Sequence, residues 1–116
     1  MGVRRIVANI AADDLAAGRE FYGTVFGLDV LMDLGWIITL GNADRMTLQL
    51  SVMREGGSGA PVPDLSIEVD DLDAILDKLQ AAGHPIEYGP AREPWGVRRF
   101  FVRDPFGKLV NVLVHL

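Results

Sequence analysis

Residues 65–72 read Leu-Ser-Ile-Glu-Val-Asp-Asp-Leu, and they join one predicted element to the next. At the start of this segment apolar and polar residues alternate, which is the period of a strand with one buried face. Asp70 or Asp71 can cap a helix that follows, because an aspartate oxygen accepts hydrogen bonds from the first backbone amides of a helix. The segment therefore predicts a strand that leads directly into a helix.

The residues after this segment predict the rest of the second half. A stripe of leucine and isoleucine at helical spacing predicts a helix that starts at Leu72. Gly83 ends this helix, since glycine readily adopts the left-handed backbone found just beyond many helices. Further strands are expected near Ile86–Tyr88, Arg98–Arg103 and Leu109–Leu116.

The first half of the chain has the same order of elements. It begins with an alternating strand over Val3–Ala11, and Asp13-Asp14-Leu15 then matches Asp70-Asp71-Leu72 at the start of a helix. With a gap of one residue, Gly27 falls on Gly83. The helix is expected over about residues 15–26, and the strands after it over 29–32, 36–40 and 45–53. The chain is thus an internal repeat of one strand, one helix and three strands.

A glycine-rich run separates the two halves. Residues 56–61, Gly-Gly-Ser-Gly-Ala-Pro, cannot hold a regular element and are expected to form a flexible connector. At 116 residues the chain has the length of one compact domain. We therefore predict a single domain over 1–116, with a first module over about 1–54, a linker over 55–61 and a second module over about 62–116.

The composition excludes several classes of function. A net charge of -5 and a pI near 4.8 argue against nucleic acid as a partner, because phosphate binding needs a surface rich in Lys and Arg. The lack of cysteine excludes disulfides and thiolate metal sites. No apolar run approaches the ~20 residues of a membrane span, so we expect no membrane partner and a cytoplasmic location.

Both halves carry polar residues on the sheet face that is not expected to pack against the helix. These residues are Thr47, Gln49 and Ser51 in the first half and Asp64, Ser66 and Glu68 in the second. Polar side chains inside a concave sheet are costly unless water, a partner or a ligand satisfies them. The pattern favours a wet cavity that binds a small organic ligand. The alternative is a sheet whose polar face lies in bulk solvent.

Three segments of the chain resemble the vicinal oxygen chelate superfamily, the glyoxalase and bleomycin-resistance group, and in particular its bleomycin-resistance branch. Asp14-Leu15 with residues 21–28 is similar to the first helix of that family and its exit. Residues 68–72 with 81–84 look like the second helix and its flanks, and residues 101–109 resemble the last hairpin, in which Asp-Pro-x-Gly makes the turn. The order and spacing of the segments cover nearly the whole chain.

The resemblance implies an α+β fold of two βαβββ modules, with curved mixed sheets around a shared cavity. It also implies a homodimer. The modules pair either within one chain or across a swapped dimer, and the sequence leaves both arrangements open. Drug-binding members of the family enclose flat, cationic or peptide antibiotics, so the resemblance implies a ligand of that kind.

Metal-dependent members of the family take one ligand from each of four positions, usually His or Gln, Glu, His and Glu. Counted from the matching motifs, these positions fall on Val7, Gln49, Asp64 and Asn111. A valine cannot bind a metal, and amides bind divalent metals poorly. We therefore expect no metal and no cofactor, and His84, which is expected on a surface loop, does not change that expectation.

Aromatic residues provide the remaining signal. Trp36 is expected at the start of a strand, and Trp95 in a loop over residues 92–96. Each is either a packing anchor or a surface that stacks on a flat or cationic ligand. The resemblance implies that Phe101 lines the pocket. The full set of predicted ligand-binding residues is Val7, Asn9, Trp36, Gln49, Ser51, Asp64, Ser66, Trp95, Arg99, Phe101 and Asn111.

Three hypotheses about function follow from these observations. The first is a metal-free module that binds or sequesters a small organic molecule, and no catalytic residue is assigned under it. The second is an enzyme with an absent or atypical metal site, a glyoxalase-type lyase or isomerase, for example, with Asp64 or Glu68 as general base. The third is a structural dimer with a vestigial pocket. The first makes the fewest demands on the residues present.

Overall fold

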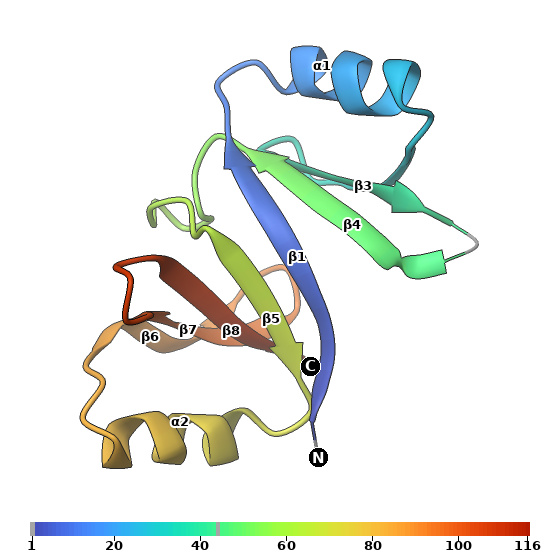
Figure 1. The fold of residues 1–116 in the computed structure, drawn as a ribbon. Helices are drawn as coiled ribbons and strands as arrows, with labels where there is room; N and C mark the ends of the chain where they lie inside the picture. Colours follow the sequence, from blue (N-terminus) through green and yellow to red (C-terminus); the bar gives the residue numbers. More distant parts are fainter. Residues whose placement is uncertain (1, 44) are drawn as a thin grey trace. The chain divides into compact units, whose positions relative to one another are not determined.

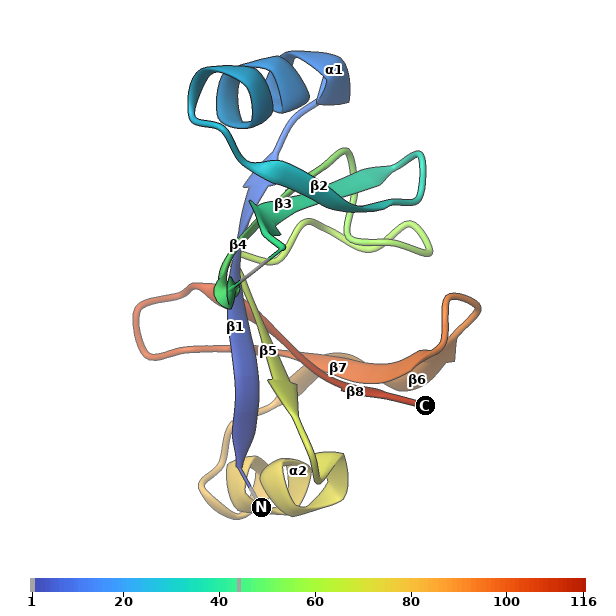
Figure 2. The same ribbon diagram turned by 90° about the vertical axis from the view of Figure 1, so that its right-hand side faces the viewer.

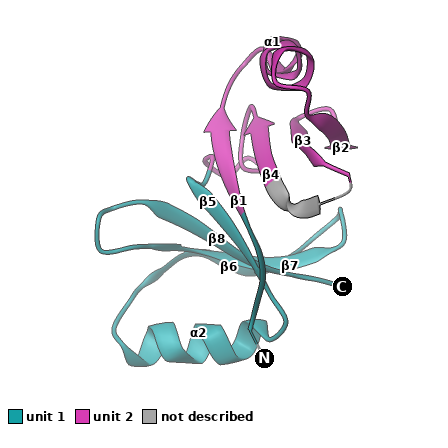
Figure 3. Cartoon of the chain, turned by 45° about the vertical axis from the view of Figure 1, so that its right-hand side comes forward, with its two compact units in different colours: residues 1–6, 63–116 teal, residues 7–62 magenta. Residues whose placement is uncertain are grey.

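A computed structural model describes residues 2–43 and 45–116 of the chain, with the side chains of residues 45–48 left undescribed. The chain divides into two compact units, which Figure 3 shows in different colours. Residues 1–6 and 63–116 form the unit called here the C-terminal unit, and residues 7–62 form the N-terminal unit. Strand β1 (Val3–Ala11) begins in the C-terminal unit and ends in the N-terminal unit.

The C-terminal unit is a mixed sheet with one helix on one face (Figure 1). Strand β5 pairs in parallel with β8, and β8, β7 and β6 pair antiparallel, so the strand order is β5-β8-β7-β6. The elements are β5 (Leu65–Val69), α2 (Leu72–Ala81), β6 (Ile86–Glu93), β7 (Val97–Arg103) and β8 (Leu109–His115).

Helix α2 begins and ends where the sequence predicts. The carboxylate of Asp71 accepts a hydrogen bond from the backbone amide of Ala74 at 3.1 Å, and this bond caps the first turn. Gly83, with a φ of 84°, follows the helix in the left-handed conformation. The helix covers a core of buried side chains from the sheet and its own first turn. These are Val69, Leu72, Phe100, Val102, Val110 and Val112.

The N-terminal unit repeats this plan, and Figure 2 shows its helix above the strands of the same unit. The strand order is β2-β3-β4-β1, with β1 parallel to β4. Its core contains Leu15, Ile38, Leu40 and Val52. The elements after β1 are α1 (Leu15–Gly18), a π-helical continuation η1 (Arg19–Val25), β2 (Asp29–Asp33), β3 (Ile37–Asn42) and β4 (Arg45–Met53).

The predicted order of strands and helices is confirmed, with local differences. The expected loop over residues 92–96 is wrong at its start, because β6 continues to Glu93, which pairs with Val97. Only Pro94, Trp95 and Gly96 therefore make the turn. The run over residues 56–61 forms a compact loop, in which the amide of Gly56 donates to the Ala60 carbonyl at 2.7 Å.

Among the helices that the structure describes, none is long and apolar enough to cross a membrane.

Two phenylalanines of the C-terminal unit allow a matched test of its core. Phe100 is 0% exposed between the sheet and α2, whereas Phe106 is 85% exposed on the turn after β7. Phe100→Ala should lower the free energy of unfolding by about 3–5 kcal/mol, because it removes buried contacts and leaves a cavity. Phe106→Ala should change it by less than about 0.5 kcal/mol. Chemical denaturation of both variants measures the difference, and equal effects would contradict this core.

Candidate functional site

The strand register of the C-terminal unit divides its side chains between two faces. Val110 and Val112 of β8 belong to the core under α2, so Asn111 between them faces away from that helix. Asn111 pairs with Ser66 of β5 and with Phe101 of β7, which places these residues on the same face. We call it the helix-free face, and the sequence predicted its polar character.

Asn111 is a buried polar residue on the helix-free face. Its side chain is 8% exposed, and its amide nitrogen donates to the hydroxyl of Ser66 at 3.1 Å. Its amide oxygen is buried and has no hydrogen-bond partner among the residues that the structure describes. If the amide were flipped, its nitrogen would occupy the position of the oxygen that lacks a partner. One end of this amide therefore has no partner in either orientation. An unsatisfied buried amide costs about 1–3 kcal/mol.

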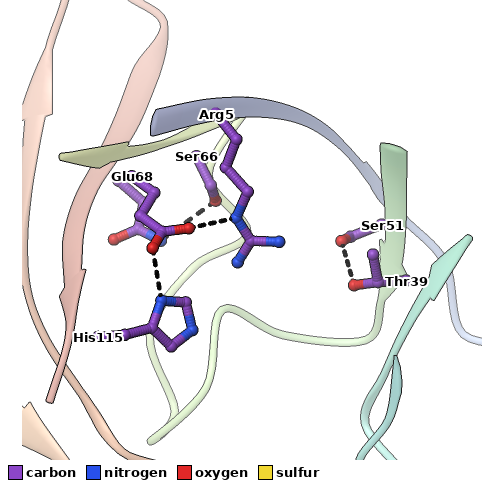
Figure 4. A network of polar contacts seen from close by, with 7 residues as sticks. Arg5, Thr39, Ser51, Ser66, Glu68 and His115 are labelled. Carbon is purple, nitrogen blue, oxygen red and sulfur yellow. Dashed lines mark hydrogen bonds and ion pairs between the residues drawn. The ribbon is translucent and has the colours of Figure 1, made fainter. Parts of the chain in front are cut away.

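Three further charged or titratable side chains meet on the helix-free face (Figure 4). The Nε of Arg5 donates to one oxygen of Glu68 at 2.5 Å, and Nδ1 of His115 lies 2.9 Å from the other oxygen. Arg5 comes from β1, Glu68 from β5 and His115 from the end of β8. Glu68 and His115 share this face because they alternate with core-packed residues of β5 and β8, and Arg5 reaches it through its contact with Glu68.

The charge state of Glu68 follows from these contacts. Burial by itself would raise the pKa of Glu68, but the hydrogen bond with His115 and the charge of Arg5 act in the opposite direction. The net result is a pKa below its ordinary value of 4.5. Glu68 is therefore an ionised hydrogen-bond acceptor at neutral pH, held in a fixed position by two partners.

Asp64 is exposed and is engaged with the backbone of β8. Its carboxylate accepts a hydrogen bond from the amide of Leu109 at 2.8 Å, and its own amide donates to the carbonyl of Leu109 at 2.8 Å. These two bonds align the chain just before β5 with the start of β8. The carboxylate thus has a structural role in pairing the strands.

The structure brings Trp95, Arg99 and Phe101 together in one cluster. The guanidinium carbon of Arg99 lies 5.2 Å from the ring centre of Tyr88, 5.0 Å from that of Trp95 and 4.8 Å from that of Phe101. The Nε of Arg99 also donates to Glu93 at 2.6 Å, and both side chains are only 4% exposed. The cluster is therefore an aromatic cage that already contains a cation and its counter-ion.

In the N-terminal unit, the predicted site residues lie on the face away from α1. Ile38, Leu40 and Val52 pack with Leu15 of that helix, so Ser51 points to the other face. Asn9 pairs with Ser51, and Gln49 and Val7 share this face by alternation. The hydroxyls of Ser51 and Thr39 are 2.7 Å apart (Figure 4). Trp36 directly precedes β3 and is half-buried.

Sequence reasoning missed several residues that the structure places in these polar groups. Tyr88 and Glu93 were not assigned to a site, although the hydroxyl of Tyr88 donates to Glu93 at 2.8 Å beside Arg99. Arg5 was also missed, and His115, whose position in the strand predicts the same face as Asn111, was expected to be exposed at the terminus and was not assigned to the site. The only available signal was the period of the strands, since His115 lies two positions from Leu113 and four from Asn111.

The residues at the four metal-ligand positions do not fit a metal. Val7 has no donor atom, and the carboxylate of Asp64 accepts the amide of Leu109. Asn111 offers only a neutral amide, which is a poor ligand for divalent metals. Within residues 2–43 and 45–116, no group of three or more His, Asp or Glu side chains is arranged to hold a metal ion. No metal-dependent step is therefore assigned to this chain.

Solved structures with the same fold include several proteins of low sequence identity. A hypothetical protein from Bacillus halodurans has a TM-score of 0.78 at 15% identity, with 100% of this chain and 96% of that chain covered. Methylmalonyl-CoA epimerase from Mycobacterium tuberculosis has a TM-score of 0.68 at 22% identity, with 99% and 88% covered. A glyoxalase/bleomycin resistance protein/dioxygenase superfamily member from Vibrio splendidus has a TM-score of 0.66 at 15% identity, with 99% and 100% covered.

The sequence itself identifies the family. A comparison with curated proteins finds no match. The sequence profile of the Glyoxalase/Bleomycin resistance protein/Dioxygenase superfamily, in contrast, matches residues 4–112, which is nearly the whole chain. This match agrees with the two modules of one strand, one helix and three strands. The chain belongs to the Glyoxalase/Bleomycin resistance protein/Dioxygenase superfamily.

Proposed function

We propose that this chain is a metal-free binding protein that sequesters a small aromatic or cationic organic molecule. The observation that carries the proposal is the buried amide of Asn111, one end of which has no partner among the described residues. Buried polar groups of folded proteins are nearly always satisfied, so an unsatisfied one suggests a missing ligand or water. Asn111 lies beside Ser66 and Phe101, which gives a ligand polar and aromatic contacts together.

Fixed polar groups around Asn111 support a binding role. Glu68 is held by Arg5 and His115, and Asn111 itself is held by Ser66. Polar groups held in this way lose little entropy when a ligand binds, because their side chains are already ordered. A pocket with a few such groups among apolar walls is the usual composition of a small-molecule site.

The contacts of the two carboxylates favour binding over general-base catalysis. A general base works best when its pKa lies near the working pH, and the pKa of Glu68 is lowered instead. Asp64 is engaged with the backbone amide of Leu109. Methylmalonyl-CoA epimerase shares the fold at 22% identity, which is too distant to transfer its reaction to this chain.

Aromatic residues of the C-terminal unit add to the proposed ligand contacts of the helix-free face. Trp95 is half-buried, so part of its indole is open to a flat ligand while its ring also contacts Arg99. Phe101 is assigned as a second aromatic contact, because it pairs with Asn111 across β7 and β8. Within the N-terminal unit we separately assign candidate ligand contacts to Val7, Asn9, Gln49 and Ser51 on its polar face and to Trp36 before β3.

Replacing the unsatisfied amide gives a direct test. A thermal-shift screen with flat aromatic antibiotics and aromatic cations should identify at least one compound that raises the melting temperature of the wild type. Asn111→Leu should abolish that shift yet leave the unliganded protein equally stable or about 1 kcal/mol more stable, because it removes a buried amide with no partner at one end.

The control for this substitution is Gln80→Leu on the exposed surface of α2, which should keep the full ligand-induced shift. The proposal is wrong if no compound of the screen stabilises the wild type. It is also wrong if Asn111→Leu binds as the wild type does. Conversion of a stabilising compound into product, detected by mass spectrometry, would favour the alternative, an enzyme.

The lowered pKa of Glu68 predicts a pH dependence of stability. Because the folded-state pKa lies below 4.5, the ionised carboxylate stabilises the fold at higher pH, and this contribution is lost as the pH falls through the lowered pKa. Between about pH 6 and pH 3, the unfolding free energy of the wild type should therefore fall more steeply than that of Glu68→Gln. Chemical denaturation across this range measures both slopes, and parallel slopes would contradict the ion-pair network.

We also propose that the chain forms a homodimer, which an exposed apolar surface at the end of η1 supports. Phe21, Val25 and Phe26 are each more than half exposed there, with Phe21 and Phe26 rings 5.3 Å apart. Contiguous exposed apolar side chains mark interaction surfaces. Sedimentation equilibrium should give twice the mass of the chain. Phe26→Glu should reduce this mass to that of a monomer, whereas Phe106→Glu on the β7–β8 turn should not.

A further inference from the structure

The C-terminal unit contains an apolar cavity that the proposed function does not use. It lies between α2 and the sheet and has a volume of about 330 Å³. Its walls are formed by Ile75 and Leu79 of α2 and by apolar side chains of the strands opposite. Among the strand residues are Ile67, Val69, Val110 and Val112.

This cavity and the helix-free face are on opposite sides of the same sheet. Val110 and Val112 line the cavity, while Asn111 between them points to the other side. A ligand in the cavity would therefore contact none of the polar residues assigned above. The two sites share only the backbone of β5, β7 and β8.

The size of the cavity limits what it can hold. Apolar cavities of ~150 Å³ stay dry and bind one benzene molecule. The cavity beneath α2 is about twice as large, at about 330 Å³, and lies at the lower end of the ~300–1,000 Å³ of small-molecule pockets. A bicyclic aromatic molecule has a suitable size. The cavity is partly open to solvent, but its apolar walls give water few polar partners, so an apolar ligand would displace that water readily.

The polar residues of the cavity limit the charge of its occupant. The guanidinium of Arg103 donates to Glu87 at 2.9 Å and to the carbonyl of Gly107 at 3.0 Å. The carboxylate of Asp104 accepts the backbone amides of Phe106 and Lys108 at 2.8 Å each. The charge of Arg103 is thus paired with Glu87, and one oxygen of the Asp104 carboxylate already accepts two backbone amides. A charged ligand among the apolar walls would therefore lose its hydration for little return.

His84 provides the remaining polar contact of the cavity. It follows Gly83 after α2, and its backbone amide donates to the carbonyl of Leu79 at 3.0 Å, which fixes it against the end of the helix. Its imidazole has no hydrogen bond or ion pair within the described part of the chain. The sequence predicted a surface loop for His84, whereas the structure makes this half-buried residue part of the cavity wall.

We propose that the cavity beneath α2 binds a small uncharged molecule with a bicyclic apolar body and one hydrogen-bonding group, which pairs with His84. The apolar walls select the body and disfavour ions, and the imidazole selects the polar group. The chain would then carry two ligand sites, one on each side of the sheet of the C-terminal unit.

1-Naphthol and naphthalene are suitable probes, since they differ only by a hydroxyl group. Both should bind the wild type in calorimetry, and 1-naphthol should bind about 3- to 10-fold more tightly because it forms a net hydrogen bond. His84→Ala should bring the two affinities to within about 2-fold of each other. A wild type that binds neither probe, or one that prefers naphthalene, would overturn the proposal.

A substitution that fills the cavity with a larger side chain tests whether the probe binds there. Ile75→Phe should reduce the affinity for 1-naphthol at least about 10-fold, whereas Leu34→Phe on an exposed turn of the N-terminal unit should leave it unchanged. In case Ile75→Phe fails to fold, methyl NMR of the wild type gives the location independently. Saturating 1-naphthol should shift the methyl signals of Ile75, Leu79 and Val112 most.

The outcomes separate this proposal from the proposed function. If 1-naphthol shifts residues of the helix-free face and leaves Ile75 and Leu79 unchanged, the cavity is not its site. Asn111→Leu should keep its affinity for 1-naphthol within about 2-fold of the wild type while it loses the ligand of the other face. Loss of both ligands in Asn111→Leu would contradict two independent sites.

Discussion

The alternation of side chains along β8 is the constraint on which both faces of the C-terminal unit depend. Val110 and Val112 supply the core under α2, and the residues between and after them supply polar groups to the opposite side. A shift of one residue in the pairing of β5 with β8 would move every one of these side chains to the other face. The two hydrogen bonds between Asp64 and Leu109 stand at the edge of this pairing and oppose such a shift.

Most of the fold could be predicted because its determinants are local. The cap at Asp71, the glycine after α2 and the period of β5 each act over a few residues, and each is found as expected. The end of β6 could not be predicted, because it depends on pairing between Glu93 and Val97 across a turn. The π-helical continuation after Gly18 has no sequence signal that we can identify.

The sequence could predict which side of the sheet carries the candidate site, but it could not predict the contacts among the residues of that site. Alternation predicted the face of Ser66, and the family resemblance added Asn111 and Phe101, which pair with each other on that face. The partners of Glu68 could not be inferred, since Arg5 and His115 are separated from it by 63 and 47 residues. The cavity beneath α2 was also beyond sequence reasoning, because it depends on how closely the helix approaches the sheet. Burial and pairing over long sequence separations set these properties.

The occupied aromatic cage around Arg99 makes the C-terminal unit a template for an engineered sensor. Shortening Arg99 to alanine would leave Tyr88, Trp95 and Phe101 with the carboxylate of Glu93 around a vacant space. Aromatic rings beside an acidic group are the composition with which proteins recognise quaternary ammonium compounds. Removing one partner of a buried ion pair costs about 3–5 kcal/mol, so such a variant would fold better when an ammonium guest restores the missing positive charge. Its folding would then report the guest.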